Sequence, residues 1–171
     1  MPEMHITPLT ASPATIDALA SLLIETVAHG GSVTFMHPLL PEKARAFWTG
    51  ALAAAARGER IVLGAFEGEA LAGTVTLALD CPENQPHRAE IAKMMTRVSH
   101  RGRGYASALL REAERLAQEH GRNLLVLDTA TDEGAAGLYE SVGYTLAGEI
   151  PDFAFKPRGG LTGTKIYWKR V

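Results

Sequence analysis

Hydrophobic residues recur at helical spacing in three long segments of the chain. The first segment starts after Ser12 and Pro13, a pair typical of a helix N-cap followed by proline at the first helical position. The second starts at Pro41, and the third covers residues 104–120 and is closed by Gly121, as expected of the glycine that follows a helix. Their one-sided apolar faces predict three amphipathic helices.

Shorter segments between these helices predict strands. Residues 61–66 and 71–79, joined by a Glu-Gly-Glu turn, are typical of an antiparallel hairpin. Residues 88–98 alternate imperfectly, which leaves room for a β-bulge. The apolar run 124–127, which ends in Asp128, is typical of a strand buried on both faces. The remaining expected elements are a strand at 5–7, a short helix at 134–142 and strands at 144–150 and 164–168, and together they predict an α/β (α+β) fold.

Composition limits the classes of protein to which the chain can belong. Its 171 residues, 46% hydrophobic and 21% charged, are expected to form a single domain over residues 1–171. The 17 lysines and arginines nearly balance the 19 aspartates and glutamates, so no broad basic field indicates nucleic-acid binding. No signal peptide is recognisable and no apolar run reaches the roughly 20 residues that span a bilayer, which argues against a membrane partner.

The cysteine and histidine residues argue against a metal site. Cys81 is the only cysteine, so an intramolecular disulfide and a cysteine cluster are excluded, and a reducing, cytoplasmic location is expected. The six histidines show no metal-ligand spacing and no His-Glu-x-x-His motif. The chain is therefore expected to hold no metal.

The sequence Arg-Gly-Arg-Gly-Tyr-Ala at 101–106 stands between a predicted strand and the third helix. Unpaired backbone N–H groups and the positive end of the helix dipole meet at such a turn, which suits a pyrophosphate. Arg101 and Arg103 add positive charge, and Gly102 and Gly104 remove side chains that would block close approach. A Walker A loop is excluded because no Gly-Lys-Ser/Thr follows. A Rossmann dinucleotide site fits poorly, because too little chain remains for further β-α-β units.

Downstream of this turn lies a second motif, Leu-Tyr-Glu-Ser-Val-Gly-Tyr at residues 138–144. The turn matches the pattern Arg/Gln-x-x-Gly-x-Gly/Ala, and the two motifs in this order resemble the GNAT superfamily of acyl-CoA-dependent N-acyltransferases. Residues 148–154 and 166–169 also resemble its tabtoxin-resistance branch. The resemblance implies a mixed, mainly antiparallel sheet that splays at its centre and is flanked by helices. It also implies that acetyl-CoA binds through Arg101, Gly102, Arg103, Gly104, Tyr105 and Ala106.

The same resemblance gives roles to residues on either side of the turn. The backbone of Met94, Met95 and Thr96 would bind the pantetheine arm, with the Met95 N–H as an oxyanion donor. Tyr139 falls on the family's tyrosine and is the candidate general acid for the departing thiolate, because a phenol with a pKa near 10 stays protonated at neutral pH. The alternative for Tyr139 is a core residue that anchors a short helix.

Two carboxylates are candidates for the general base. Glu90 starts the strand that leads to the turn, where many relatives carry a catalytic glutamate, and Asp128 ends the adjoining apolar strand. Alternatively, Glu90 pairs with Arg88 or Lys93, and Asp128 caps the following loop. Asp132 stands where many relatives have an asparagine that contacts the coenzyme, so that contact is in doubt.

The sequence leaves the acceptor open. Loops 30–38 and 151–163 are expected to line its site, through Phe35, His37, Asp152 and Phe153. A small amine, an amino-acid-like compound and a protein N-terminus all fit.

The sequence thus favours direct acetyl transfer from acetyl-CoA to a primary amine, small-molecule or peptide, in a ternary complex. The alternatives are a non-catalytic acyl-CoA-binding regulatory module and a Rossmann-type dinucleotide-binding protein. Because GNAT-like domains often pair through their terminal strands, the resemblance also implies a homodimer.

Overall fold

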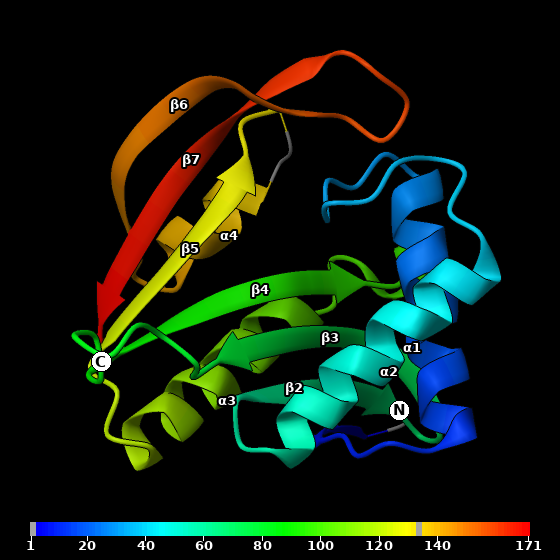
Figure 1. The fold of residues 1–171 in the computed structure, drawn as a ribbon, viewed down its shortest axis with the longest axis horizontal. Helices are drawn as coiled ribbons and strands as arrows, with labels where there is room; N and C mark the ends of the chain where they lie inside the picture. The colour runs from blue at the N-terminus through cyan, green and yellow to red at the C-terminus, as the bar shows by residue number, and fades with distance from the viewer. Residues whose placement is uncertain (1–2, 133–134) are drawn as a thin grey trace.

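Seven strands form one mixed sheet in the computed structural model, which describes residues 3–132 and 135–171 (Figure 1). The strands lie in the order β1-β2-β3-β4-β5-β7-β6, and only the pair β4–β5 is parallel. The expected mixed, mainly antiparallel sheet with flanking helices is confirmed. The strands are β1 Met4–Pro8, β2 Arg60–Glu67, β3 Ala70–Ala78, β4 Arg88–Thr96, β5 Leu124–Ala130, β6 Thr145–Phe155 and β7 Leu161–Arg170. The helices are α1 Pro13–Ala28, α2 Pro41–Ala56, α3 Tyr105–Glu119 and α4 Ala135–Ser141, with a 3₁₀ turn, η1, at Val98–His100.

Local sequence signals account for the ends of the long helices. The Ser12 Oγ accepts a hydrogen bond from the Thr15 N–H (3.1 Å), and Pro13 is the first residue of α1. Helix α3 starts directly after Gly104, whose φ of 89° is left-handed, and Gly121, with a φ of 71°, follows its last turn. These predicted helix ends are confirmed.

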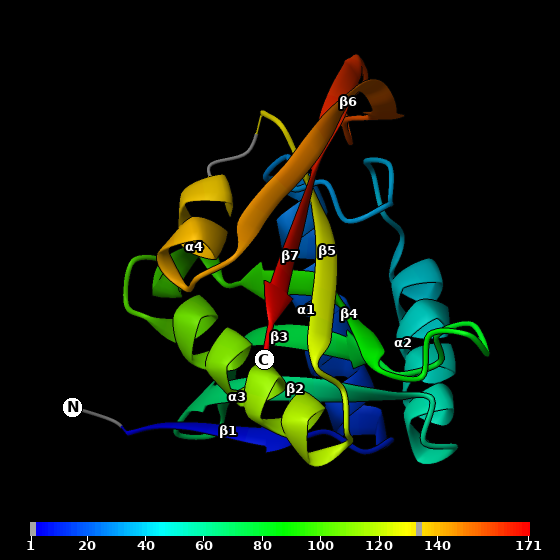
Figure 2. The ribbon, with the colours of Figure 1, turned by 90° about the vertical axis from the view of Figure 1, so that its left-hand side faces the viewer.

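Two helical layers enclose the sheet, with α1 and α2 on one face and α3 and α4 on the other (Figures 1 and 2). The first face buries Trp48 completely, and the second buries Leu109 completely. Burial of such a side chain contributes about 1.5–3 kcal/mol. β4 belongs to both cores, through Ala89 and Ile91 on the α3 face and Met95 on the α1–α2 face. The position of β4 is therefore fixed from both sides.

The sheet opens between β4 and β5. These strands pair only between residues 88–90 and 124–126, and beyond them they diverge (Figure 1). In the same part of β4, Lys93 and Met94 together lie opposite a single residue of β3, Val75, which is a β-bulge. The predicted bulge and the expected splay are confirmed.

Several predicted strand ends are wrong. β4 ends at Thr96, two residues early, because the chain turns into η1. β5 continues to Ala130, so Asp128 lies inside a strand and pairs with Ile166 of β7 instead of capping a loop. β5 is buried on one face only, because its other face borders the opening. Of the predicted helix 134–142, residue 134 lies outside the described residues.

The last hairpin is longer than the sequence predicts. β6 runs through Pro151 to Phe155, because an edge strand tolerates a residue without an N–H, and β7 already starts at Leu161. Much of the predicted loop 151–163 is therefore strand. β6 exposes large apolar side chains, among them Ile150 (42%) and Phe155 (64%). Association through the terminal strands stays a prediction.

Gly73 of β3 provides a test of how tightly β4 is held. A Cβ at this position would lie 2.9 Å from the Met95 carbonyl oxygen and 3.3 Å from the Leu109 Cδ1. We expect Gly73→Ala to displace β4 and to lower the free energy of unfolding by about 1–3 kcal/mol, the usual cost of overpacking. Chemical denaturation measures this change.

Gly50 is the matched control, because it lies exposed in α2 and a Cβ there would meet nothing within 4 Å. Gly50→Ala should raise the free energy of unfolding by about 0.5–1 kcal/mol, since alanine is the better helix former. Equal stabilities of the two variants would contradict the close packing of β3 on β4.

Candidate functional site

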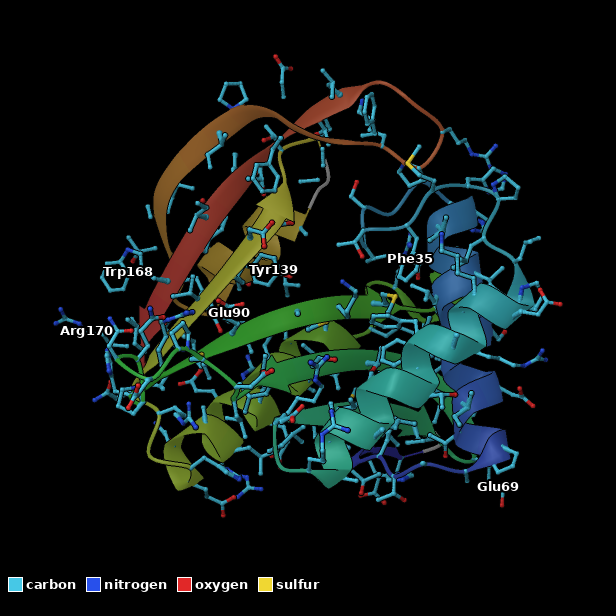
Figure 3. All side chains as sticks on the ribbon, in the orientation of Figure 1. Phe35, Glu69, Glu90, Tyr139, Trp168 and Arg170 are labelled. Carbon is cyan, nitrogen blue, oxygen red and sulfur yellow. The ribbon has the colours of Figure 1, made fainter. Side chains whose placement is uncertain are left out.

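A cleft of about 940 Å³ occupies the opening between β4 and β5. Its floor is formed by the diverging strands, and its walls by the segment after α1, the turn before α3, helix α4 and parts of β6 and β7. Glu90 and Tyr139 approach it from different elements, β4 and α4 (Figure 3). The cleft therefore connects the turn motif with the second motif of the sequence.

Within the turn at 101–106, every residue except Arg103 borders this cleft: Arg101, Gly102, Gly104, Tyr105 and Ala106. Gly102 and Gly104 have φ values of 73° and 89°, and a Cβ on either would meet nothing within 4 Å. The left-handed backbone favours glycine at both positions, and no protein atom occupies the space that a Cβ would fill. The turn leads directly into α3, so the positive end of that helix faces the cleft.

Glu67, at the end of β2, contacts two side chains of the turn and is not part of the cleft lining. Its Oε2 accepts a hydrogen bond from the Tyr105 hydroxyl (2.9 Å) and pairs with Arg103, and the His100 Nε2 lies 3.7 Å away. The Tyr105 hydroxyl, with help from Arg103, holds the pKa of Glu67 below its usual range, although desolvation opposes the shift. The Arg103 side chain, predicted to attract phosphate, is directed to this carboxylate instead.

The bulge places the side chains of β4 on different faces. Met95 is 2% exposed and packs with α1 and α2, whereas Met94 packs against the α3 core. The Met95 side chain is therefore core, the Met94 side chain is partly buried, and both residues line the cleft. Lys93, with a φ of 53°, also lines the cleft, and its Nζ lies 5.6 Å from the centre of the Phe47 ring.

Tyr139 is nearly buried, with 5% of its surface exposed on the wall of the cleft. Its ring contacts those of Tyr144 and Tyr167, at centroid distances of 5.9 and 6.0 Å. The Tyr167 hydroxyl donates to Glu140 (3.2 Å). Within the described residues the buried Tyr144 hydroxyl has no hydrogen-bond partner, and burial raises its pKa well above the usual range. Of these three tyrosines only Tyr139 reaches the cleft.

Glu90 and Asp128 line the same face of the opening. Their strand neighbours Ala89, Ile91 and Leu127 belong to the α3 core, so the two carboxylates point to the opposite face. The side chain of Glu90 is 51% exposed and accepts a hydrogen bond from Arg88 (2.7 Å). The Asp128 Oδ2 accepts one from the Thr164 hydroxyl (3.1 Å). The predicted Glu90–Arg88 pair exists, and it leaves Glu90 at the cleft.

Of the four predicted acceptor contacts, only Phe153 is on the wall of the cleft as formed by the described residues. Phe35 packs edge-on against Phe47 (5.3 Å), away from Tyr139 (Figure 3). The His37 N–H donates to the Pro157 carbonyl (2.8 Å), and Asp152 lies in an irregular part of β6 with a φ of 51°.

Residues 30–34 of the predicted loop 30–38 form one wall of the cleft, immediately before the predicted aromatic contacts, and His29 extends that wall. Lys93, on the floor of the cleft, was not predicted to lie there. The only signal for Lys93 was the broken alternation of β4.

The comparisons with known proteins identify the family. A sequence profile of the acetyltransferase (GNAT) family matches residues 25–144, which is more than half of the chain. The chain belongs to the GNAT acetyltransferase family. Human N-acetyltransferase 8B is 35% identical over 83 residues, which cover 47% of this chain and 37% of that protein. The part of this chain that matches thus spans well under half the length of the human protein.

Solved GNAT structures share the fold of this chain. A GNAT acetyltransferase from Streptococcus pneumoniae is 22% identical, with a TM-score of 0.77 over 99% of this chain and 100% of that one. A ribosomal-protein-alanine N-acetyltransferase from Brucella melitensis is 20% identical, with a TM-score of 0.80 over 96% and 99%. A Salmonella typhimurium acetyltransferase, described with its cofactor acetyl-CoA, is 18% identical, with a TM-score of 0.77 over 96% and 93%. The tabtoxin-resistance resemblance stays a prediction.

Two features are absent from the described parts of this GNAT chain. Among residues 3–132 and 135–171, no three histidine, cysteine, aspartate or glutamate side chains gather where they could hold a metal ion. Over the same residues, no helix has both the length and the apolar character needed to cross a membrane.

Glu67→Gln tests the anchor of the turn. The variant keeps the shape of the side chain but loses the negative charge that accepts the Tyr105 hydrogen bond and pairs with Arg103. We expect amide hydrogen exchange in residues 101–106 to become several-fold faster, because hydrogen bonds to charged groups are the stronger ones. Glu59→Gln is the control, since Glu59 pairs with Arg57 away from the turn.

The same variant has a predicted pH signature. Because the folded-state pKa of Glu67 is lowered, its stabilising contribution is complete above the ordinary glutamate pKa of about 4.3 and is lost as the pH falls through the folded value. Glu67→Gln should therefore lose less stability than the wild type on acidification below about pH 4. Identical acid unfolding curves would show that Glu67 does not hold the turn.

Proposed function

We propose that this chain is an N-acetyltransferase that moves an acetyl group from acetyl-CoA to a primary amine by direct attack. One observation carries the proposal: a single cleft joins the turn before α3 to Tyr139, Glu90 and Asp128. Family membership supports the acetyl transfer, and the acetyl-CoA described with the Salmonella structure supports the choice of donor.

The donor half of the cleft has the groups that coenzyme A requires. In the proposal its pyrophosphate binds at the outward N–H groups of residues 102–106, where the α3 dipole adds positive potential. The pantetheine arm follows Met94, Met95 and Thr96, where β4 no longer pairs with β5 and its backbone borders the cleft. The Met95 N–H, expected from the sequence to donate to the thioester oxygen, faces β3 instead. Met95 lies opposite Thr74, and the Arg97 N–H two residues later donates to the Ala72 carbonyl, so both residues belong to hydrogen-bonded pairs of the β3–β4 ladder.

The acceptor half of the cleft has the groups that move protons. An ammonium ion must lose a proton before it attacks the thioester carbon, and Glu90 is the proposed acceptor of that proton. Asp128 is the alternative proton acceptor, because both carboxylates already accept a hydrogen bond, Glu90 from Arg88 and Asp128 from Thr164. As the tetrahedral intermediate collapses, the C–S bond breaks and the Tyr139 hydroxyl protonates the thiolate. The nitrogen then loses its second proton, which restores the Tyr139 hydroxyl, and Glu90 releases the first proton to water. The products are an amide and free coenzyme A.

Acetyl-CoA-dependent release of thiol, measured against a panel of primary amines, tests the proposed function. We expect release to depend on an amine and the acetylated amine to appear in equal amount. Tight binding of acetyl-CoA without amine-dependent release from any panel member would favour a non-catalytic acyl-CoA-binding module instead.

Tyr139→Phe tests the proposed acid. Removal of the hydroxyl should lower kcat by about 100-fold or more, the usual range for a positioned proton donor, and change acetyl-CoA affinity little. Tyr144→Phe is the matched control, because its ring neighbours that of Tyr139 and its hydroxyl is buried without a partner in the described structure. That variant should keep its kcat and its stability. Equal kcat values for Tyr139→Phe and the wild type would remove Tyr139 from the mechanism.

A further inference from the structure

Lys93 lies on the floor of the cleft, between the two proposed halves, and has no part in the reaction described above. It contributes the only lysine to the wall of the cleft among the described residues. The one arginine on the lining of the cleft among the described residues, Arg101, belongs to the turn. The Lys93 Nζ lies over the Phe47 ring of α2, so the Lys93 side chain points to the same face of the sheet as Glu90 and Asp128. Lys93 thus faces the acceptor half of the cleft.

The backbone holds Lys93 in this place at a cost. In a regular strand it would follow Ile91 onto the α3 face, but the bulge adds one residue and turns it to the other side. The bulge also gives Lys93 a φ of 53°, a left-handed conformation that is unfavourable for a lysine. Strain of this kind is retained where the position of the side chain has a use.

The Lys93 ammonium lacks a close anionic partner. No carboxylate oxygen lies within 4.0 Å of it in the described residues, and its contact is the face of the Phe47 ring. Burial lowers the pKa of Lys93, and the nearby Asp128 carboxylate opposes this shift. The Lys93 Nζ therefore has a ring contact and no salt bridge within the described residues.

We propose that Lys93 binds a carboxylate carried by the acceptor, and that the acceptor is an amino acid or an amino-acid-like compound. The carboxylates of Glu90 and Asp128 can bind an ammonium group, and the Lys93 side chain can bind a carboxylate. Together these charges complement those of a zwitterionic amino acid. With a simple amine as acceptor, Lys93 would have only the more distant Asp128 carboxylate and no carboxylate in contact with it, and in the proposal the coenzyme phosphates bind at the turn. This assignment rests on the proposed function.

Pairs of amines that differ only in the carboxylate provide the test. Amino acids and their decarboxylated amines are compared as acceptors of acetyl groups, with the wild type, Lys93→Met and Lys93→Arg. The wild type should favour the amino acid in at least one pair. Lys93→Met, which keeps the apolar stem over Phe47, should lower kcat/KM for that amino acid by about 10- to 100-fold, mainly through the acceptor KM. Its kcat/KM for the decarboxylated partner and its KM for acetyl-CoA should stay within about twofold, and Lys93→Arg should recover part of the loss.

Lys43→Met is the control, because the Lys43 Nζ also lies over a phenylalanine ring, that of Phe35 (6.0 Å), but outside the cleft. It should not change the preference. A wild type that acetylates amines but never favours the carboxylate-bearing partner would overturn the assignment of Lys93 alone, even if the variants fail to fold. Equal losses for both partners in Lys93→Met would overturn it as well. Failure to acetylate any amine would instead overturn the proposed function.

Discussion

The structure depends on the early end of the pairing between β4 and β5. Parallel strands in the middle of a sheet normally satisfy each other's backbone groups along their length. Here the ladder ends after Glu90 and Val126, while β4 and β5 stay paired on their other edges with β3 and β7. The backbone freed in this way lines the cleft, and the residues that follow Glu90 become available to a ligand. The two cores on either side of β4 make this gap possible, because they hold the strand without help from β5.

Features that depend on neighbouring residues were predictable from the sequence. The Ser12–Pro13 start of α1, the left-handed Gly104 before α3 and the β2–β3 hairpin each follow from chemistry within a few residues. The turn at 101–106 and the segment around Tyr139 were recognisable as motifs for the same reason. Their approach to one cleft followed from the order of the elements in a GNAT-like fold, which the sequence resembles.

Features that depend on distant residues were not predictable. Nothing near Arg103 or Tyr105 indicates that both bind Glu67, which lies 36 and 38 residues earlier in the chain. The end of β6 was misplaced because proline usually interrupts a strand, whereas the edge position of β6 removes that conflict. Phe35 was assigned to the acceptor site because it is aromatic and in a loop, but α2 offers it the Phe47 ring. In each case the partner, not the residue, decides the role.

The open end of the cleft is also held, by the connection between β6 and β7. Lys156 pairs with Asp132 just beyond β5 (2.7 Å), while the Arg158 guanidinium donates to the carbonyl of Ala28 at the end of α1 (2.7 Å). This short loop therefore links the arm that follows β5 to the wall that follows α1. The β4–β5 pairs fix the narrow end of the opening, and these contacts fix its wide end. A change in the width of the cleft must break either the β4–β5 pairs or the contacts of the β6–β7 loop. The exposed Lys156–Asp132 ion pair is the weaker of these, since exposed ion pairs contribute little to stability in water.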